Sequence, residues 1–311
     1  MARAAQPFAA LACALALAVS AGAAAGQTPW MLEEGITIRV SEHVYVIPSK
    51  GRRAVPNVGI VVGTRATLIV DTGLGTRNGE IVLREMKKVS KAAPTYLTAT
   101  HFHPEHIGGE QAFPPEARTI RSRALQEEVA AKGARYIDLF RGFSETNKEL
   151  LKDHAFRPPD VLFERELTVD LGGVTVQMHW FGPAHTEGDT LFHVLGDGVL
   201  FTGDVAQKQL MPAMPDDGAS GLSWIKILDQ VEALKPRIIV PSHGELADAS
   251  IIAPQREVLT TLRDRVLELK KRGVPLAEAS EILAKELEAK YTGWGNTNAI
   301  RRAVARFYAE L

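Results

Sequence analysis

Short apolar runs, bounded by glycine or polar residues, predict that much of the chain consists of strands. Residues 58–63 and 67–71 are almost wholly apolar, which is typical of buried strands. Apolar residues at helical spacing over 79–90 predict a helix that packs through one face. Further strands are predicted at residues 36–40, 43–47, 94–100, 166–170, 174–181, 190–195, 199–202 and 237–241, with a helix at 221–234.

A charged insert separates the two groups of predicted strands. Residues 118–132 and 137–154 have a helical pattern with many charges. Phe140, Phe143 and Phe156 in this region either line a pocket or, as apolar residues of helices usually do, pack in a core.

The last part of the chain is wholly helical in its pattern. Glycine and proline residues separate its amphipathic segments. We expect residues 251–311 to form a C-terminal helical extension on a main domain at 27–250, without a separate fold. The predicted helices of the extension cover residues 255–272, 276–291 and 296–308.

The first 26 residues have the pattern of a secretory signal peptide. A basic start is followed by an apolar run from Phe8 to Val19, and small residues then suit signal peptidase. The run is short for a membrane span, so a retained anchor is the less favoured alternative. We expect cleavage between Ala24 and Gln27, a secreted, periplasmic product and no stable membrane anchor afterwards.

The charge balance and the single cysteine exclude some classes of ligand and catalytic group. Lys and Arg number 36 against 37 Asp and Glu, a formal net charge of -1, so no basic surface for nucleic acid is predicted. Cys13 is the only cysteine and lies in the predicted signal peptide. A mature chain without it has no disulfide, cysteine nucleophile or thiolate ligand, so His, Asp and Glu must hold any metal.

One loop, with the sequence His-Phe-His-Pro-Glu-His-Ile-Gly-Gly, follows a predicted strand and concentrates metal-binding groups. His101, His103, Glu105 and His106 lie within six positions. Imidazole and carboxylate groups are common ligands of first-row divalent metals. Pro104 disfavours helical backbone at the residue before it, so we expect a loop that enters a helix. A polar loop with solvated histidines is the less favoured alternative.

Three further candidate ligands each follow a predicted strand and stand near glycine. They are His185 in Pro-Ala-His-Thr-Glu-Gly-Asp, Asp204 in Phe-Thr-Gly-Asp, and His243 in Pro-Ser-His-Gly. A strand holds the backbone rigid and the turn after it directs one side chain, so residues far apart in sequence can reach one site.

The order of these motifs resembles that of the metallo-β-lactamase superfamily of metal-dependent hydrolases, which includes glyoxalase II. The resemblance covers roughly residues 36–249 and includes the Val-Asp-Thr-Gly turn at Asp71 and the His-Thr-x-Gly-Asp sequence at His185. It implies a mixed α/β (α+β) protein with the αββα sandwich of that family, here followed by the helical extension. Periodicity alone predicts only a mixture of helices and strands.

The resemblance also implies a role for each candidate ligand. In this family a hydroxide between two metals is the nucleophile, and bound zinc lowers the pKa of water to about 7. The expected cofactor is zinc, in two ions per chain, although ligands without sulfur also permit iron or manganese. By position, His101, His103 and His185 would hold the first metal, His106 and His243 the second, and Asp204 would bridge the two.

Glu105 departs from the family pattern, in which an aspartate usually binds the second metal and orients the hydroxide. Glutamate is longer by one methylene group, whereas ligand distances vary by only about 0.2 Å. The loop or the second metal must therefore shift, or Glu105 acts only through a hydrogen bond. We expect Glu105 and Asp204 to be the catalytic carboxylates.

Two acidic residues and one loop have both a functional and a structural interpretation. Asp71 and Asp189 either orient ligand imidazoles or serve only the turns in which they lie. The Pro-rich segment 208–216 either forms a pocket wall or only crosses over the sheet.

Three functions are compatible with these residues. The first is a secreted hydrolase that uses a metal-bound hydroxide on a small ester, thioester, lactone or amide. The second is a β-lactam-hydrolysing enzyme, which Asp204 disfavours because the lactamases of the family lack that bridging acid. The third is a non-catalytic metal-binding accessory protein, which a second site weakened by Glu105 favours. A small molecule is the expected partner, and the oligomeric state is not predicted.

Overall fold

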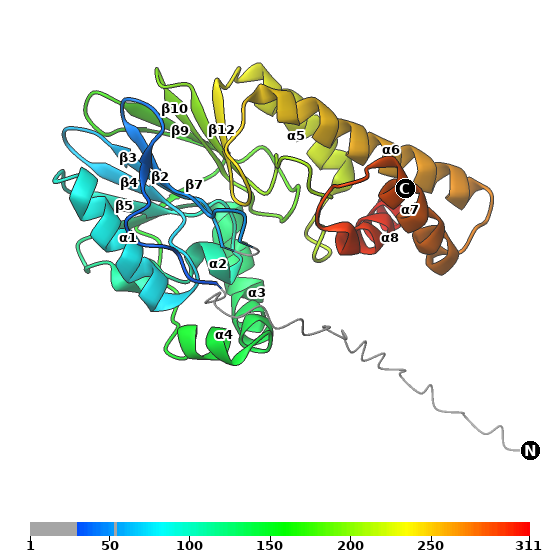
Figure 1. Cartoon of the computed structure of the whole chain (residues 1–311), viewed down its shortest axis with the longest axis horizontal. Coiled ribbons are helices and arrows are strands. Elements are labelled where there is room, and N and C mark those ends of the chain that lie inside the picture. The colour runs from blue at the N-terminus through cyan, green and yellow to red at the C-terminus, as the bar shows by residue number, and fades with distance from the viewer. Residues whose placement is uncertain (1–29, 53–54) are drawn as a thin grey trace, which may run out of the picture.

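The computed structural model describes residues 30–52 and 55–311, arranged in layers of helix, sheet, sheet and helix (Figure 1). This is the αββα sandwich that the family resemblance implies. The predicted signal peptide at residues 1–26 lies outside the described residues. Within those residues, no helix combines the length and the apolar character that crossing a bilayer requires.

The first sheet follows the order of its strands in the chain. Its first four strands pair antiparallel, and the pairs from β4 to β7 are parallel. The strands are β1 (Ile38–Arg39), β2 (Val44–Ile47), β3 (Val58–Val62), β4 (Thr67–Val70), β5 (Thr95–Thr98), β6 (Arg118–Ser122) and β7 (Val161–Phe163).

The second sheet has the order β12-β11-β10-β9-β8, and only β11 and β12 pair parallel. Alternate side chains such as Val176 and Phe192 face the first sheet, where they pack against Val46 and Leu68 in a buried core. The strands are β8 (Glu166–Asp170), β9 (Thr175–His179), β10 (Leu191–Leu195), β11 (Val199–Gly203) and β12 (Ile238–Pro241).

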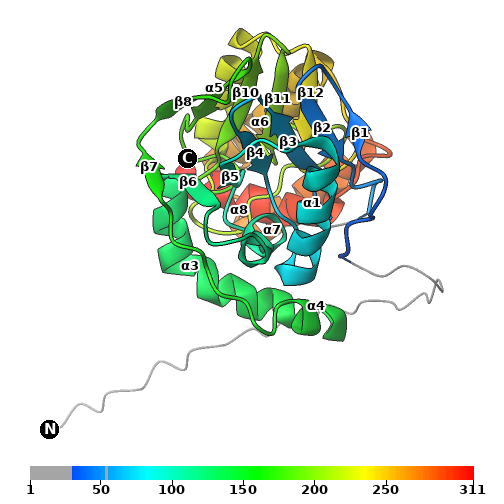
Figure 2. The same ribbon diagram turned by 90° about the vertical axis from the view of Figure 1, so that its left-hand side faces the viewer.

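Amphipathic helices cover the outer faces of the sheets. α1 (Gly75–Val89) packs on the first sheet through Ile81, Val82 and Met86. α5 (Gly221–Ala233) packs on the second through a core that includes Trp224. The shorter α2 (Pro104–Ile107), with α3 (Arg123–Arg141) and α4 (Glu145–Leu150), lies at one end of the sandwich, where α3 and α4 form a ridge (Figure 2).

The prediction of a helix over 118–132 is wrong at its start. Residues Arg118–Ser122 form strand β6, and α3 begins only at Arg123, with Ser122 as its N-cap. Arg121 looks like an exposed helix residue in the sequence, but its side chain is fully buried and pairs with Glu110. The second predicted helix, over 137–154, is interrupted: α3 continues to Arg141, and α4 follows at Glu145–Leu150.

The C-terminal helices share one apolar core with α5. Val258, Leu283 and Phe307 are fully buried in this core, which also contains Trp224. The ring of Phe307 lies so close to α5 that a Cβ atom at Gly221 would be 2.2 Å from it. The helices of the extension are α6 (Ile252–Lys271), α7 (Leu276–Lys290) and α8 (Ile300–Glu310).

Candidate metal centre

The histidine-rich loop lies against the turn that follows β4. The backbone N–H of Thr72 donates to the carbonyl of His106 over 2.8 Å. A Cβ atom at Gly109 would be 2.2 Å from the Thr72 carbonyl oxygen, and one at Gly108 would be 2.6 Å from the backbone nitrogen of Gly75. The motif therefore ends in Gly-Gly because no larger residue permits this approach of two backbones.

Three imidazoles meet in a first cluster. His103 Nδ1 lies 3.0 Å from His101 Nε2 and 3.4 Å from His185 Nε2. One ligand atom from each residue lies within 4.8 Å of the other two, and all three side chains are buried. This spacing brings three nitrogen donors around one point.

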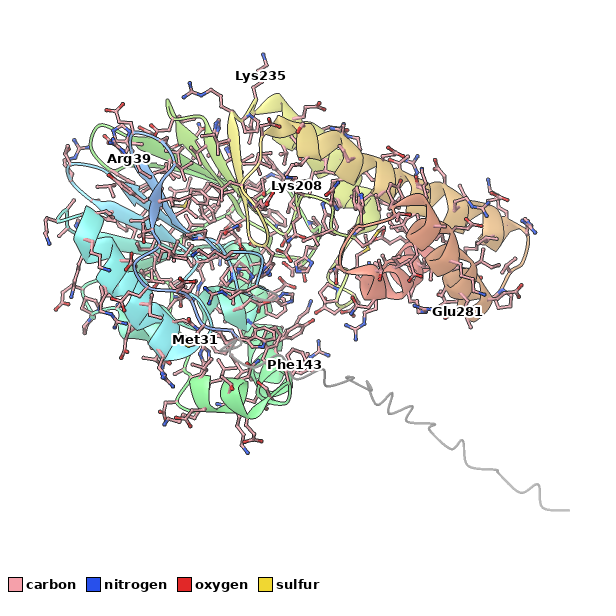
Figure 3. The ribbon with its side chains drawn as sticks, in the orientation of Figure 1. Met31, Arg39, Phe143, Lys208, Lys235 and Glu281 are labelled. Carbon is pink, nitrogen blue, oxygen red and sulfur yellow. The ribbon has the colours of Figure 1, made fainter. Side chains whose placement is uncertain are left out.

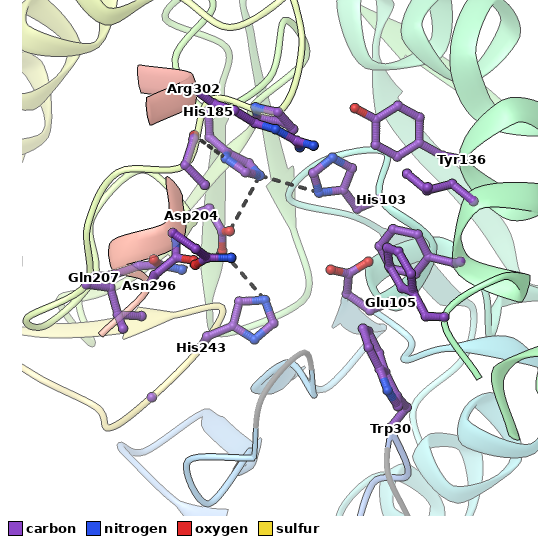
Figure 4. A pocket seen from close by; sticks show the side chains of 18 of the residues that line it. Trp30, His103, Glu105, Tyr136, His185, Asp204, Gln207, His243, Asn296 and Arg302 are labelled. Atoms are coloured by element: carbon purple, nitrogen blue, oxygen red, sulfur yellow. Dashed lines mark hydrogen bonds and ion pairs between the residues drawn. The ribbon is translucent and has the colours of Figure 1, made fainter. Parts of the chain in front are cut away.

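A second cluster lies beside the first. One ligand atom each from Glu105, His106 and His243 lies within 4.8 Å of the others. Asp204 stands between the clusters, with Oδ2 at 3.4 Å from His185 Nε2 and Oδ1 at 3.8 Å from His243 Nε2 (Figure 4). The structure thus brings together all the candidate ligands that the sequence predicts.

Backbone carbonyls fix the tautomers of two of these imidazoles. His185 Nδ1 donates to the Ala213 carbonyl over 2.8 Å, and His243 Nδ1 donates to the Val55 carbonyl over 3.1 Å. A carbonyl oxygen only accepts, so the proton resides on Nδ1 and leaves the lone pair on Nε2. In both residues Nε2 is the atom that faces Asp204.

Asp71 orients a third imidazole. Its Oδ2 accepts from His106 Nδ1 at 2.8 Å, and its Oδ1 accepts from the Thr100 backbone N–H at 2.7 Å. Asp189 does not do the same for His185, because its carboxylate accepts from the backbone and hydroxyl of Thr186 at 2.9 and 2.8 Å. The functional interpretation therefore suits Asp71, and the structural one suits Asp189.

Burial and neighbouring charges set the protonation of the clusters. Burial, with the nearby imidazoles, lowers the pKa of His101 and His103 well below the usual value, so both are neutral donors at pH 7. Burial alone would also lower the pKa of His106, but the Asp71 carboxylate raises it to about 9. Burial raises the pKa of Glu105 to about 7.

The donor set fits a divalent cation. Glu105 Oε2 and His106 Nε2 are buried, and neither has a hydrogen-bond partner among the described residues. Leaving such atoms unpaired is costly, and a cation bound between them would satisfy both. Nitrogen and carboxylate donors without sulfur are a common zinc-binding set.

Two residues of the site were not predicted. The ring of Tyr136 stacks on His103 with centroids 5.0 Å apart, and its hydroxyl donates to Asp216 over 2.9 Å. Gln207 donates to Asp204 Oδ1 over 2.6 Å. Its position three residues after Asp204 is a signal that the sequence offers, whereas Tyr136 looks like any apolar-face residue of a helix.

The two clusters lie at a pocket with a volume of about 990 Å³. Phe140 and Phe143 line it, whereas Phe156 packs against His154 with ring centroids 4.6 Å apart. Segment 208–216 supplies a wall, as one of its two interpretations predicts. The residues of this segment in the lining are Lys208, Leu210, Ala213, Pro215 and Asp216.

The C-terminal extension holds this wall in place. The Met211 backbone N–H donates to the Gly295 carbonyl over 3.0 Å, and the Gly295 N–H donates to the Gln209 carbonyl over 2.9 Å. Asn296 donates its amide to the Met211 carbonyl over 3.0 Å. Because the same segment carries the Ala213 carbonyl, the extension supports the orientation of a candidate ligand.

Comparison with known proteins agrees with this geometry. The sequence profile of the metallo-beta-lactamase superfamily matches residues 51–243. The chain belongs to this superfamily. Its members are metal-dependent hydrolases, which supports hydrolase activity in this protein. The two ligand clusters are the candidate centre for a divalent metal.

The relatives of this superfamily member are named for different substrates. It is 23% identical over 229 residues to a type 2 metallo-beta-lactamase of Bacteroides fragilis, covering 71% of this chain and 84% of the relative. It is 30% identical over 226 residues to the acyl-coenzyme A thioesterase MBLAC2 of Gallus gallus, covering 64% and 75%.

A solved structure extends the likeness in fold. The stereoselective inverting sec-alkylsulfatase Pisa1 from Pseudomonas sp. superposes with a TM-score of 0.69 at 18% identity. The match covers 88% of this chain but only 50% of that enzyme, so the superfamily member spans about half its length.

Proposed function

We propose that this superfamily member is a secreted, zinc-dependent hydrolase of a small ester, thioester, lactone or amide. The observation that carries the proposal is the convergence of two ligand clusters, joined by Asp204, at the pocket. The thioesterase activity in the name of one relative supports an acyl substrate. The N-terminal sequence supports export, and the N-terminal residue of the exported protein is the check.

The residues of the site would have separate roles in this reaction. Bound divalent metal supplies Lewis-acid activation of water and of the attacked carbonyl group. His101, His103 and His185 would hold one ion, and Ala213 orients the last of these through its carbonyl. Tyr136 packs against the first cluster and excludes water from one side of His103.

Glu105 reaches the second cluster despite its departure from the family pattern. Its Oε1 atom lies 3.9 Å from His106 Nε2, and His243 completes the group. We therefore propose two zinc ions per chain; Glu105 would be a ligand of the second, and Asp204 would be available to both. Gln207 holds the Asp204 carboxylate in that position.

Metal content and a substrate panel test the proposal together. We expect plasma mass spectrometry to find two zinc ions per chain, and the loaded enzyme to hydrolyse at least one ester, thioester, lactone or amide. Bound metal without turnover of any of these substrates would favour the non-catalytic accessory protein instead.

A β-lactam substrate is the second candidate, because one relative is a metallo-beta-lactamase. Nitrocefin at micromolar enzyme distinguishes the two functions. Turnover of nitrocefin that exceeds turnover of every ester would replace our proposal, whereas no turnover with metal fully loaded would reject the β-lactam function.

Asp71→Asn is expected to weaken the second metal site selectively. Asparagine tolerates the left-handed backbone of this residue, whose φ is 65°, so the turn survives while the charge that orients His106 is lost. Loss of such an outer partner costs roughly 10–100-fold in metal affinity or activity. Zinc titration should show the second ion weakened by that factor. Asp189→Asn is the matched control, and an equal effect there would contradict the assignment.

A further inference from the structure

The pocket has an apolar wall beyond the two ligand clusters. Trp30 packs against Phe140 and Phe143 with ring centroids 5.7 and 6.0 Å apart, and the two phenylalanine rings lie 5.0 Å apart. Leu139 completes this wall. Phe143 lies just after α3, on the side of the main domain that faces the C-terminal extension (Figure 3).

A side-chain amide positions the tryptophan of this wall. Asn78 donates to the Trp30 carbonyl over 2.9 Å and accepts from the Leu32 backbone N–H over 2.7 Å. Trp30 has a φ of 71°, a conformation that a bulky residue rarely adopts without support. The two bonds from one buried amide supply that support and hold the indole beside α3.

Two members of the wall are unusually exposed. Leu139 is 49% exposed and Phe143 is 51% exposed. Large apolar side chains that remain open beside a ligand pocket are typical of a surface that a ligand covers. The polar metal clusters do not need such a wall, so its occupant is the part of the substrate that does not react.

Cationic groups stand elsewhere around the same pocket. Arg302 of α8 is exposed and has no ion-pair partner within residues 30–52 and 55–311, and Figure 4 shows it above His185. Arg135 of α3 lies 3.7 Å from Asp216, but that carboxylate already binds Lys132 at 3.1 Å. The neighbouring Arg301 differs, because Glu281 accepts from it at 2.7 and 2.8 Å.

We propose that the substrate is an amphiphilic ester or thioester, with an apolar acyl chain and a leaving group that carries an oxyanion. The acyl chain lies along Trp30, Leu139, Phe140 and Phe143, and Arg302 and Arg135 bind the oxyanion. This inference rests on the proposed function. Hydrolysis breaks the acyl C–O or C–S bond, joins the water oxygen to the acyl carbon, and gives a water proton to the leaving alcohol or thiol.

Chain length tests the apolar wall. With 4-nitrophenyl esters from acetate to decanoate, each added methylene should raise kcat/KM by about two- to fourfold until the wall is covered. Leu139→Ala and Phe143→Ala should flatten this gradient. Leu276→Ala is the matched control, because Leu276 is 38% exposed outside the pocket lining, and its gradient should equal that of the wild type.

Leaving-group charge tests the arginines. Two thioesters with the same acyl chain are compared: one releases the anionic thiol 3-mercaptopropionate, and the other releases the neutral thiol N-acetylcysteamine. The rate of each reaction is measured from the thiol released. Arg302→Gln should lower the ratio of kcat/KM for the anionic over the neutral thioester by about tenfold or more, mainly through KM. Arg301→Gln, one residue away, should keep the wild-type ratio.

The outcomes separate this inference from the proposed function. Turnover of the acetate ester without a chain-length gradient, or an unchanged ratio in Arg302→Gln, overturns the substrate class and leaves the hydrolase function standing. Failure of the metal-loaded enzyme to hydrolyse any ester, thioester, lactone or amide overturns both, whereas turnover of only a lactone or an amide overturns this inference alone.

Discussion

His103→Ala is expected to remove metal from the first cluster and to abolish hydrolysis. His103 Nδ1 lies within 3.4 Å of the donor atoms of both His101 and His185, so its loss opens the cluster at its centre. The fall in kcat/KM should exceed the roughly 10–100-fold that loss of an outer partner causes. Plasma mass spectrometry and ester kinetics on the same preparation measure both effects.

His43→Ala provides the control for this experiment. His43 pairs with Asp197 at 2.9 Å and is not part of the pocket lining, so the variant should keep two ions and its turnover. Circular dichroism should show that both variants are folded. Zinc content and turnover at wild-type levels in His103→Ala would refute the assignment of this centre.

Phe307→Ala is expected to cause a large loss of stability outside the site. The Phe307 side chain is fully buried between α8 and the start of α5. Removing a buried phenylalanine ring costs about 3–5 kcal/mol, because apolar burial is lost and a cavity remains. Urea denaturation should therefore show a free energy of unfolding lower by this amount.

Phe143→Ala is the same substitution at an exposed position. Phe143 is 51% exposed, so its truncation removes less buried area and should lower the free energy of unfolding clearly less than Phe307→Ala does. A similar loss in both variants, or a loss below about 1 kcal/mol in Phe307→Ala, would show that the extension is not packed as described.

The local motifs made much of this site predictable. The imidazoles of His-x-His-x-Glu-His can point to one side only where the backbone is extended or turns. Gly108 and Gly109 after them indicate that two backbone segments approach closely. The sequence also shows that His185, Asp204 and His243 each follow a predicted strand. Their convergence could be expected only through the family resemblance, since spacing in sequence carries no distance in space.

The errors arose where tertiary contacts override local pattern. Arg121 is charged, yet it lies fully buried in β6 because Glu110 neutralises it, and no periodicity reveals such a pair. Leu139 and Phe143 fit the apolar stripe of a helix, but they face a pocket. The stripe identifies which residues are apolar and does not identify what they contact.

The hydrogen bonds between segment 208–216 and Gly295–Asn296 have a consequence for how the chain can be divided. A shortened chain that ends at residue 250 keeps every candidate ligand but loses the hydrogen bonds that hold segment 208–216. The Ala213 carbonyl in this segment fixes the tautomer of His185. A graft of the candidate ligands and their strands onto another scaffold should therefore include the C-terminal extension.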